Sequence, residues 1–315
     1  MLTTVGLDIS KATIDVCVLK TKEDRDFYKF DNNERGHKQL LDLLVNLEVA
    51  LVILEPTGGY EAAICAVFHR HKYAIHRVNT LSFHNFAKSL SLAKNDRIDA
   101  YKLAYYGVSM DIKANYHQSE YQQQLKDLVA RREYLVGQLS NEKKNLKHKE
   151  HSKIKSSISA HITYLTNAIK DLDKQIDDFA LSEKEQAKKV ELACSVPGIG
   201  KTLSYKLLAF LPELGDNSFD LNELAAITGL APYCRDSGNQ SGKRFIRGGR
   251  KIPRDALYMA VLSGCDQIPL LKDLKERLLK NGKPKKVAIV ACMRKLLGIL
   301  HSIFKRREAF VEQIA

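Results

Sequence analysis

The sequence predicts an α/β domain followed by helices, a fold class of α/β plus α. Short apolar segments alternate with segments of helical periodicity up to about residue 117, as in a sheet packed against helices. Residues 118–190 contain no proline and a single glycine. Residues 191–315 have the pattern of helices separated by glycine-containing loops. We therefore predict three parts, at residues 1–117, 118–190 and 191–315.

The first part should contain a mixed sheet, because its apolar segments have the length of strands. Residues 50–55 (ALVILE) are a short apolar run that ends at Pro-Thr-Gly-Gly, which predicts a buried central strand. Three strands are expected first, and helices and strands should then alternate. The expected strands are 3–10, 12–19, 25–30, 50–55 and 74–78, and the expected helices are 37–47, 59–71 and 79–90.

Apolar side chains in the middle part recur every three or four residues, as they do on one face of a helix. The first stripe is Leu125, Leu128, Leu135, Leu139 and Leu146, and the second is Ile154, Ile158, Ile162, Leu165, Ile169, Leu172, Ile176 and Phe179. This pattern predicts two long helices in a coiled-coil hairpin. The pattern leaves open whether the hairpin is a spacer or a surface for dimerisation or nucleic-acid contact.

Positive charge is concentrated toward the C-terminus. The formal charge is +13 with a pI near 9.3, and residues 201–315 hold 21 lysines and arginines against 11 acidic residues. Such a distribution is typical of a surface that binds phosphates. No signal segment or apolar run of about 18 residues is found, so we expect a cytoplasmic protein with no membrane partner. The six cysteines form no C-x-x-C pair, which argues against a zinc site.

Four acidic residues are candidates for a metal site. Asp8 lies within a predicted strand, and Glu55 lies where an apolar strand meets a turn. Asp96 and Asp99 are three residues apart, which places both side chains on one face of a helix. Because clustered carboxylates repel one another unless cations lie between them, we predict that these four residues bind Mg²⁺ or Mn²⁺ and are catalytic.

Each of these signals has an ordinary alternative. A single aspartate in a strand, or a pair three residues apart, is more often a helix cap or a solvent-facing side chain. The segment GLDIS also resembles the first strand of sugar kinases and actin-like ATPases. Those proteins need further glycine-rich phosphate loops downstream, and the sequence contains none.

Two C-terminal segments have the composition of nucleic-acid contacts. Residues 196–204 (VPGIGKTLS) resemble the hairpin of a helix-hairpin-helix motif, in which a helix N-terminus faces a phosphate; a simple connecting turn is the alternative. Residues 235–254 carry seven basic residues and one acidic residue, so a polyanion should order this loop. The predicted nucleic-acid-binding residues are Lys201, Arg235, Lys243, Arg244, Arg247, Arg250, Lys251 and Arg254.

The same basic loop contains two Ser-Gly pairs, at Ser237 and Ser241. A serine on a flexible loop between arginines is a candidate nucleophile for a phosphate, because the arginines would stabilise the developing charge. Composition alone does not choose between the two serines, and serines in loops are usually just polar surface residues.

These motifs together resemble one family over essentially the full length of the chain. The chain is similar to DEDD-type transposases of the insertion-sequence one-ten family, a group that includes Piv-type pilin-gene DNA invertases. The N-terminal motifs are GLDISK, EPTGGYE and KNDRIDA, and the C-terminal motifs are VPGIGKTLS, LAAITGLAPYCRDSG and GKRFIRGGR. The resemblance implies a RuvC/RNase H-like N-terminal domain, a coiled-coil hairpin, and a helical C-terminal domain with a helix-hairpin-helix-like motif.

The resemblance also implies roles for individual residues and partners. It implies that Asp8, Glu55, Asp96 and Asp99 form the metal-binding tetrad, and that Ser237 forms a covalent phosphoserine with DNA. It further implies double-stranded DNA as substrate, a structured noncoding guide RNA, and assembly as a homodimer or homotetramer. In such an assembly the carboxylates of one subunit would meet the serine of another.

Three alternatives to a transposase remain at this point. A Piv-type invertase of the same family would invert a DNA segment instead of moving an element. A Holliday-junction-resolving nuclease with a RuvC-like domain would use water as its nucleophile and would not need the serine. A non-catalytic DNA-binding protein would tolerate the loss of all four carboxylates.

Overall fold

The computed structural model describes residues 3–21, 23–90, 95–116, 120–233, 242 and 244–312. Contacts divide the chain into two compact units, Met1–Glu120 and Tyr121–Ala315. We describe each unit by itself. The division into three parts at residues 117 and 190 stays a prediction.

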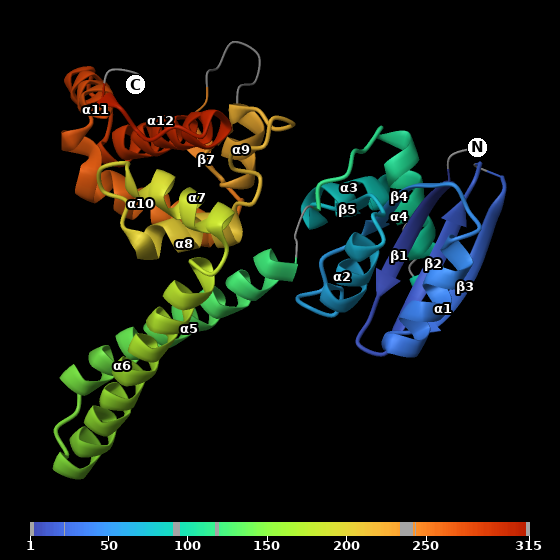
Figure 1. Cartoon of the computed structure of the whole chain (residues 1–315), viewed down its shortest axis with the longest axis horizontal. Helices are drawn as coiled ribbons and strands as arrows, with labels where there is room; N and C mark the ends of the chain where they lie inside the picture. Colours follow the sequence, from blue (N-terminus) through green and yellow to red (C-terminus); the bar gives the residue numbers. More distant parts are fainter. Residues whose placement is uncertain are drawn as a thin grey trace. The chain divides into compact units, whose positions relative to one another are not determined.

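The N-terminal unit is built on a mixed five-stranded sheet (Figure 1). Its strand order is β3-β2-β1-β4-β5. β1, β2 and β3 pair antiparallel, whereas β4 lies parallel to β1, and β5 lies parallel to β4. The strands are β1 Thr3–Ile9, β2 Thr13–Leu19, β3 Arg25–Asp31, β4 Val49–Leu54 and β5 Ile75–Arg77. The predicted mixed sheet is therefore confirmed.

Helices cover both faces of this sheet. Alternate residues of a strand point to opposite faces, so Leu7 packs in one apolar cluster with Leu40 of α1 and Phe68 of α2. On the other face, Ile53 packs with Leu103 of α4 and Phe83 of α3. The helices are α1 Glu34–Leu44, α2 Ala62–Arg70, α3 Thr80–Leu90 and α4 Asp96–Ser109. The predicted alternation of helices and strands is confirmed, and α4 completes it.

The second unit begins with two long helices, α5 Glu120–Lys147 and α6 Ser152–Ala180. They run side by side in opposite directions, as Figure 1 shows. Tyr121 stacks on Phe179 with ring centroids 4.7 Å apart, and Arg132 forms an ion pair with Asp173. Leu135, Leu165 and Ile169 form a small apolar cluster between the two helices. The two predicted long helices are thus present; coiled-coil packing stays a prediction.

The rest of this unit is a helical bundle with a small two-stranded sheet. Its elements are α7 Lys184–Cys194, α8 Lys201–Phe210, α9 Leu221–Ile227, β6 Pro232–Tyr233, β7 Phe245–Ile246, α10 Lys251–Gly264, a 3₁₀ turn Cys265–Gln267, α11 Pro269–Lys280 and α12 Lys285–Arg306. Sequence periodicity did not predict β6 and β7, because strands of two residues leave no periodic pattern.

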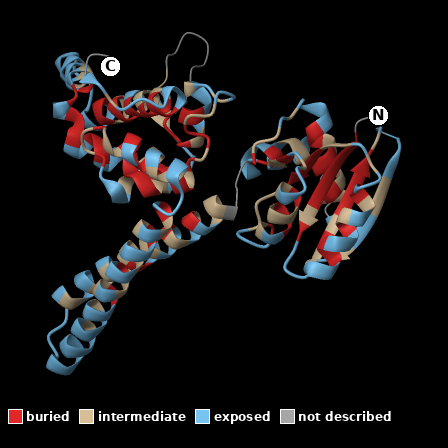
Figure 2. Cartoon of the chain, viewed as in Figure 1, coloured by how far each residue is buried: buried red, intermediate tan, exposed pale blue. Residues whose placement is uncertain are grey.

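Helix α12 is the centre of this bundle. Its buried side chains include Leu296, Leu297 and Leu300, each at most 1% exposed, and they join the main apolar cluster of the unit. Figure 2 colours each residue of the ribbon by its burial. Among the described helices, α12 has the length and apolar composition of a membrane span. A buried core helix has the same composition, and α12 is such a helix.

Candidate active site

Two of the predicted site residues lie at one edge of the N-terminal sheet. β1 and β4 are parallel neighbours, and Leu7 pairs with Leu54. Asp8 and Glu55 are the next residues along the two strands, so the register brings them together at the same edge. The carboxyl ends of adjacent parallel strands are a common position for functional side chains. Both residues are half-buried.

The same row of side chains continues across the antiparallel strands. Asp8 of β1 pairs with Asp15 of β2, and Asp15 pairs with Lys29 of β3. Lys29 Nζ lies 2.9 Å from Asp15 Oδ2 and 3.9 Å from Asp96 Oδ2. Asp15 is therefore a fifth carboxylate beside the predicted four, and it has its own counter-ion. Sequence reasoning missed Asp15 and Lys29, because only strand pairing shows that they share a row with Asp8.

Helix α4 brings the remaining two carboxylates to this edge. Asn95 caps the helix, and its side chain accepts a hydrogen bond of 2.7 Å from the Ile98 amide. Asp96 and Asp99 lie in the first turn, where the helix dipole favours negative charge. The Asp96 side chain is 70% exposed and that of Asp99 is 23% exposed. Asp99 Oδ1 also lies 3.7 Å from the buried Lys102 amine.

Gly6 allows α4 to approach the sheet this closely. A Cβ atom at Gly6 would overlap the backbone of Ala100 and Ala104. Both alanines are fully buried, so small residues on the helix meet a glycine on the strand. Two residues beyond Gly6 along β1 is Asp8, and one residue before Ala100 is Asp99. The contact therefore places these two carboxylates near each other.

The pKa of Asp8 is raised because its side chain is partly buried and negative charges crowd around it. Burial, and after it the charges of Asp99, Asp96, Asp15 and Glu55 in that order, together raise the pKa of Asp8 to about 6. A carboxylate with this environment is stabilised by a nearby cation. Among the described residues, no three His, Cys, Asp or Glu side chains are close enough to enclose an ion as they stand. Carboxylate oxygens are the ligands that suit Mg²⁺ or Mn²⁺, and these carboxylates would have to come closer together to bind an ion.

The turn after Glu55 is held by a buried glutamate. Glu61 is 4% exposed, and its Oε2 accepts hydrogen bonds from Thr57 Oγ1 at 2.6 Å and from the Gly59 amide at 2.9 Å. Its other oxygen accepts from the Arg77 guanidinium. Burial alone would raise the pKa of Glu61, but the bonds from Thr57 and the charge of Arg77 hold it below its usual range. Glu61 ends the motif EPTGGYE, but nothing in the local sequence marks it as a buried residue.

We expect Glu61→Gln to lower the stability of the folded protein by about 2 kcal/mol at pH 7, because a buried charged hydrogen-bond network loses one partner. The folded-state pKa of Glu61 is lowered, so its ionised form stabilises the fold above about pH 4.5. This stabilisation is lost as the pH falls through the lowered pKa. Urea unfolding at several pH values measures it, and a difference from wild type that stays constant down to pH 3 contradicts the assignment.

The predicted nucleic-acid-binding residues lie in the second unit, and several already have partners. Lys201 Nζ lies 3.1 Å from Asp177, and Lys251 Nζ lies 2.6 Å from Asp255. Arg247 is exposed. The Arg244 and Arg254 guanidinium groups donate to the carbonyls of Gly242 and Gly248, respectively. Their contact with nucleic acid stays a prediction.

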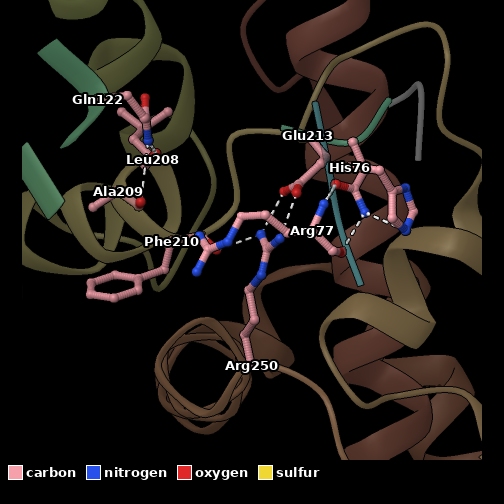
Figure 3. A network of polar contacts seen from close by, with 9 residues as sticks. His76, Arg77, Gln122, Leu208, Ala209, Phe210, Glu213 and Arg250 are labelled. Carbon is pink, nitrogen blue, oxygen red and sulfur yellow. Dashed lines mark hydrogen bonds and ion pairs between the residues drawn. The ribbon is translucent and has the colours of Figure 1, made fainter. Parts of the chain in front are cut away.

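Arg250 is held more firmly than the other basic residues. Its guanidinium donates to both carboxylate oxygens of Glu213, at 2.7 and 2.6 Å, and to the Phe210 carbonyl at 3.0 Å. Figure 3 shows this network. Glu213 is 4% exposed, so the pair ties the start of α10 to the end of α8. In this conformation the guanidinium of Arg250 is engaged with the protein itself.

The chain on either side of the basic loop that contains Ser237 and Ser241 is held by backbone pairing. β6 pairs with β7 through Pro232 with Ile246 and Tyr233 with Phe245. The Arg250 amide donates to the Ile227 carbonyl at 2.7 Å. These contacts hold the two flanks of the loop together. Four residues of the sequence prediction lie outside the described residues: Arg235, Ser237, Ser241 and Lys243.

Comparison with known proteins identifies the family. Residues 5–149 match a family model of DEDD transposases of the IS110 type, described as a transposase. Residues 190–274 match a second model, described as transposase of the IS116/IS110/IS902 family. The pilin gene-inverting proteins of Moraxella lacunata and Moraxella bovis are each 32% identical to this chain, over 99% of it and 98% of their own length. The chain belongs to the IS110 transposase family.

A further relative covers only part of the chain. The insertion element IS900 uncharacterized 42 kDa protein of Mycobacterium paratuberculosis is 30% identical over 46% of this chain and 37% of its own length. The family resemblance of the sequence motifs is thus confirmed. As an IS110-family member, the protein is a DNA recombinase or transposase enzyme that binds DNA, and its family implies dependence on a divalent metal ion.

Proposed function

We propose that this IS110-family protein cuts and rejoins DNA phosphodiesters with a carboxylate tetrad and a serine. The tetrad is Asp8, Glu55, Asp96 and Asp99 in a RuvC-like N-terminal domain, and the nucleophile is Ser237. The observation that carries the proposal is geometric: parallel pairing of β1 with β4 puts Asp8 and Glu55 at one sheet edge, and α4 holds Asp96 and Asp99 in its first turn. Burial and the charges of Asp99, Asp96, Asp15 and Glu55 raise the pKa of Asp8 there. Such crowding is costly unless the site binds cations.

Each residue of the tetrad has a distinct position in the mechanism. Asp8 and Glu55 come from neighbouring strands of a rigid sheet and would hold Mg²⁺ or Mn²⁺ at its edge. Asp96 and Asp99 come from the first turn of α4, beside that edge, and would supply the remaining carboxylate ligands of the metal. When bound, the metal supplies Lewis-acid stabilisation of charge at the scissile phosphate. Lys29 and Lys102 balance part of the negative charge of the carboxylates in its absence.

The chemical step conserves the number of phosphoester bonds. The Ser237 hydroxyl oxygen attacks phosphorus, a bond from serine to phosphorus forms, and one deoxyribose oxygen leaves. The serine proton passes to the departing oxygen, which becomes a free hydroxyl. Because the covalent link keeps the bond energy, the reverse attack by a deoxyribose hydroxyl reseals the strand without ATP. The basic loop residues would stabilise charge on the phosphate.

The working assembly would contain more than one subunit and an RNA. We propose a homodimer or homotetramer in which the tetrad of one subunit meets Ser237 of another. The α5–α6 hairpin would pair subunits by coiled-coil packing, and residues 196–204 would contact DNA as a helix-hairpin-helix-like motif. A structured noncoding RNA would select the DNA. These points rest on family membership and on the basic C-terminal region.

DNA inversion is the second candidate for the biological outcome. The pilin gene-inverting proteins match over the full chain, whereas the IS900 protein matches over less than half of it. This difference in coverage favours inversion without excluding transposition, since both use the same strand chemistry. The DNA that flanks the gene distinguishes them. Inverted repeats around a promoter or coding segment indicate inversion, and element ends with a structured noncoding region indicate transposition.

We expect Ser237→Ala to abolish the covalent adduct between protein and DNA, because alanine has no oxygen to attack phosphorus. The substrate is a labelled DNA fragment spanning the sequences that flank the gene, with Mg²⁺ and RNA transcribed from the same region. The adduct is detected as labelled protein that resists SDS. Ser241→Ala is the matched control and should keep the adduct. An adduct that persists in Ser237→Ala and disappears in Ser241→Ala assigns the nucleophile to Ser241 instead.

A further inference from the structure

Two arginines on the N-terminal unit are stacked on aromatic rings beside the carboxylate row, by which we mean Asp8, Asp15, Glu55, Asp96 and Asp99. The guanidinium carbon of Arg25 lies 4.6 Å from the ring centroid of Tyr101, and that of Arg97 lies 4.2 Å from the ring centroid of Phe27. Both distances are within the range of cation–π contacts. Arg25 and Phe27 are on β3, whereas Arg97 and Tyr101 are on α4, so the two contacts run in opposite directions between the same two elements.

The two arginines belong to one surface. Phe27 and Tyr101 pack on the same small apolar cluster as Cys17, on the face of the sheet that α4 covers. Burial raises the pKa of the Cys17 thiol to about 12, and the charges of Arg25 and Arg97 both oppose this rise. Their positive charges therefore act on the same place. We call Arg25, Phe27, Arg97 and Tyr101 the arginine ledge.

The ledge has unused donors and a fixed geometry. Both arginines are exposed, and in the described part of the chain neither has an ion pair or hydrogen bond to its guanidinium. A guanidinium carries five N–H donors in a planar fork that fits phosphate oxygens. Stacking on a packed ring already restricts the arginine side chain, so it loses little further conformational entropy when it binds a phosphate. β3 is also the edge strand of the sheet.

The ledge adjoins the proposed catalytic residues. Arg97 lies between Asp96 and Asp99 in the first turn of α4. Every second residue of a strand points to the same face, so Arg25, Phe27 and Lys29 of β3 share one face. Lys29 contacts both Asp15 and Asp96. A chain of phosphates that reaches the carboxylates from this side would therefore pass the ledge.

We propose that the arginine ledge binds backbone phosphates of the DNA strand that is cut, next to the scissile phosphate. This inference rests on the proposed function, because it takes the carboxylate row as the site of cleavage. It is a binding site in the N-terminal unit, whereas the nucleic-acid-binding residues predicted from the sequence all lie in the C-terminal part. Positively charged donors at this position also offset the repulsion between the carboxylates and the DNA backbone.

Salt-dependent DNA binding by the full-length protein tests the ledge without chemistry. A short fluorescein-labelled DNA duplex is titrated in EDTA at several KCl concentrations and followed by anisotropy. We expect Arg25→Ala and Arg97→Ala each to reduce the salt slope of binding by about 1 and to weaken binding about fivefold at about 0.15 M salt. Arg35→Ala is the matched control, because Arg35 is an exposed arginine on α1, which covers the opposite face of the sheet.

The remaining variants separate the possible failures. Arg25→Lys and Arg97→Lys keep the charge and should keep the salt slope, so they report on the ledge if an alanine variant unfolds. Slopes of the arginine-to-alanine variants equal to that of Arg35→Ala overturn the proposal. The same titration is repeated with an RNA duplex of the same sequence. If the alanine variants weaken RNA binding and leave DNA binding unchanged, the ledge is an RNA-binding site and the proposal is overturned. If Asp8→Asn still cleaves DNA while the ledge variants lose salt slope, the tetrad fails, the ledge remains a DNA-binding surface, and its position next to the scissile phosphate is overturned.

Discussion

Asp8→Asn is expected to reduce DNA cleavage by about a thousandfold while DNA binding in EDTA is retained. Asparagine keeps the shape of the side chain and removes its charge, and Asp8 is the member of the proposed tetrad in the middle of the sheet, beside both Glu55 and Asp15. The loss should extend to the metal: Mn²⁺ binding followed by titration calorimetry should weaken in the same variant. Retained strand exchange in Asp8→Asn, or in Asp8→Ala, would remove Asp8 from the catalytic residues.

The same substitution should stabilise the metal-free protein. The folded-state pKa of Asp8 is about 6, above its usual value of 3.8, so at pH 7 its ionisation opposes folding. Removing the charge should add about 1 to 2 kcal/mol at pH 7 after allowance for partial exposure. The gain should shrink as the pH falls from 6 to below 3.8, because the carboxyl is then protonated in both states. Asp42→Asn, at an exposed position on α1, is the matched control and should change neither stability nor cleavage.

Gly6→Ala is expected to cost about 3 kcal/mol of stability and most of the cleavage activity. The added Cβ would overlap backbone atoms of Ala100 and Ala104, and a backbone cannot rotate away as a side chain can. α4 must therefore shift, and the shift carries Asp96 and Asp99 away from Asp8. A displacement of about 1 Å in a catalytic group is enough to cost about a hundredfold in rate.

Urea unfolding and cleavage of the flanking-DNA substrate measure the two effects of Gly6→Ala. Gly137→Ala is the matched control, because Gly137 is in the middle of α5 and a Cβ there meets nothing within 4 Å. That control should stabilise the protein by about 0.5 to 1 kcal/mol, through the higher helix propensity of alanine. A Gly6→Ala protein as stable and active as wild type would show that α4 can be accommodated further from the sheet without loss of the site.

Local sequence pattern determined the elements and the residue types of this protein. The apolar runs and their spacing predicted the five strands of the N-terminal sheet, the long helices α5 and α6 and the helical C-terminal region. The motifs around Asp8, Glu55 and Asp99 led to the family, which the comparisons confirmed. Periodicity succeeds here because the burial of one face depends on residues close together in the chain.

Only the tertiary structure decided which residues are neighbours. The parallel pairing of β1 with β4 put Asp8 beside Glu55, and the antiparallel pairing with β2 and β3 added Asp15 and Lys29 to the same row. These contacts depend on strand order and on closing long loops, which no local pattern records. The same reason applies to the Arg250–Glu213 pair and to the stacking of α4 on β3, where residues far apart in sequence meet only after the chain has folded.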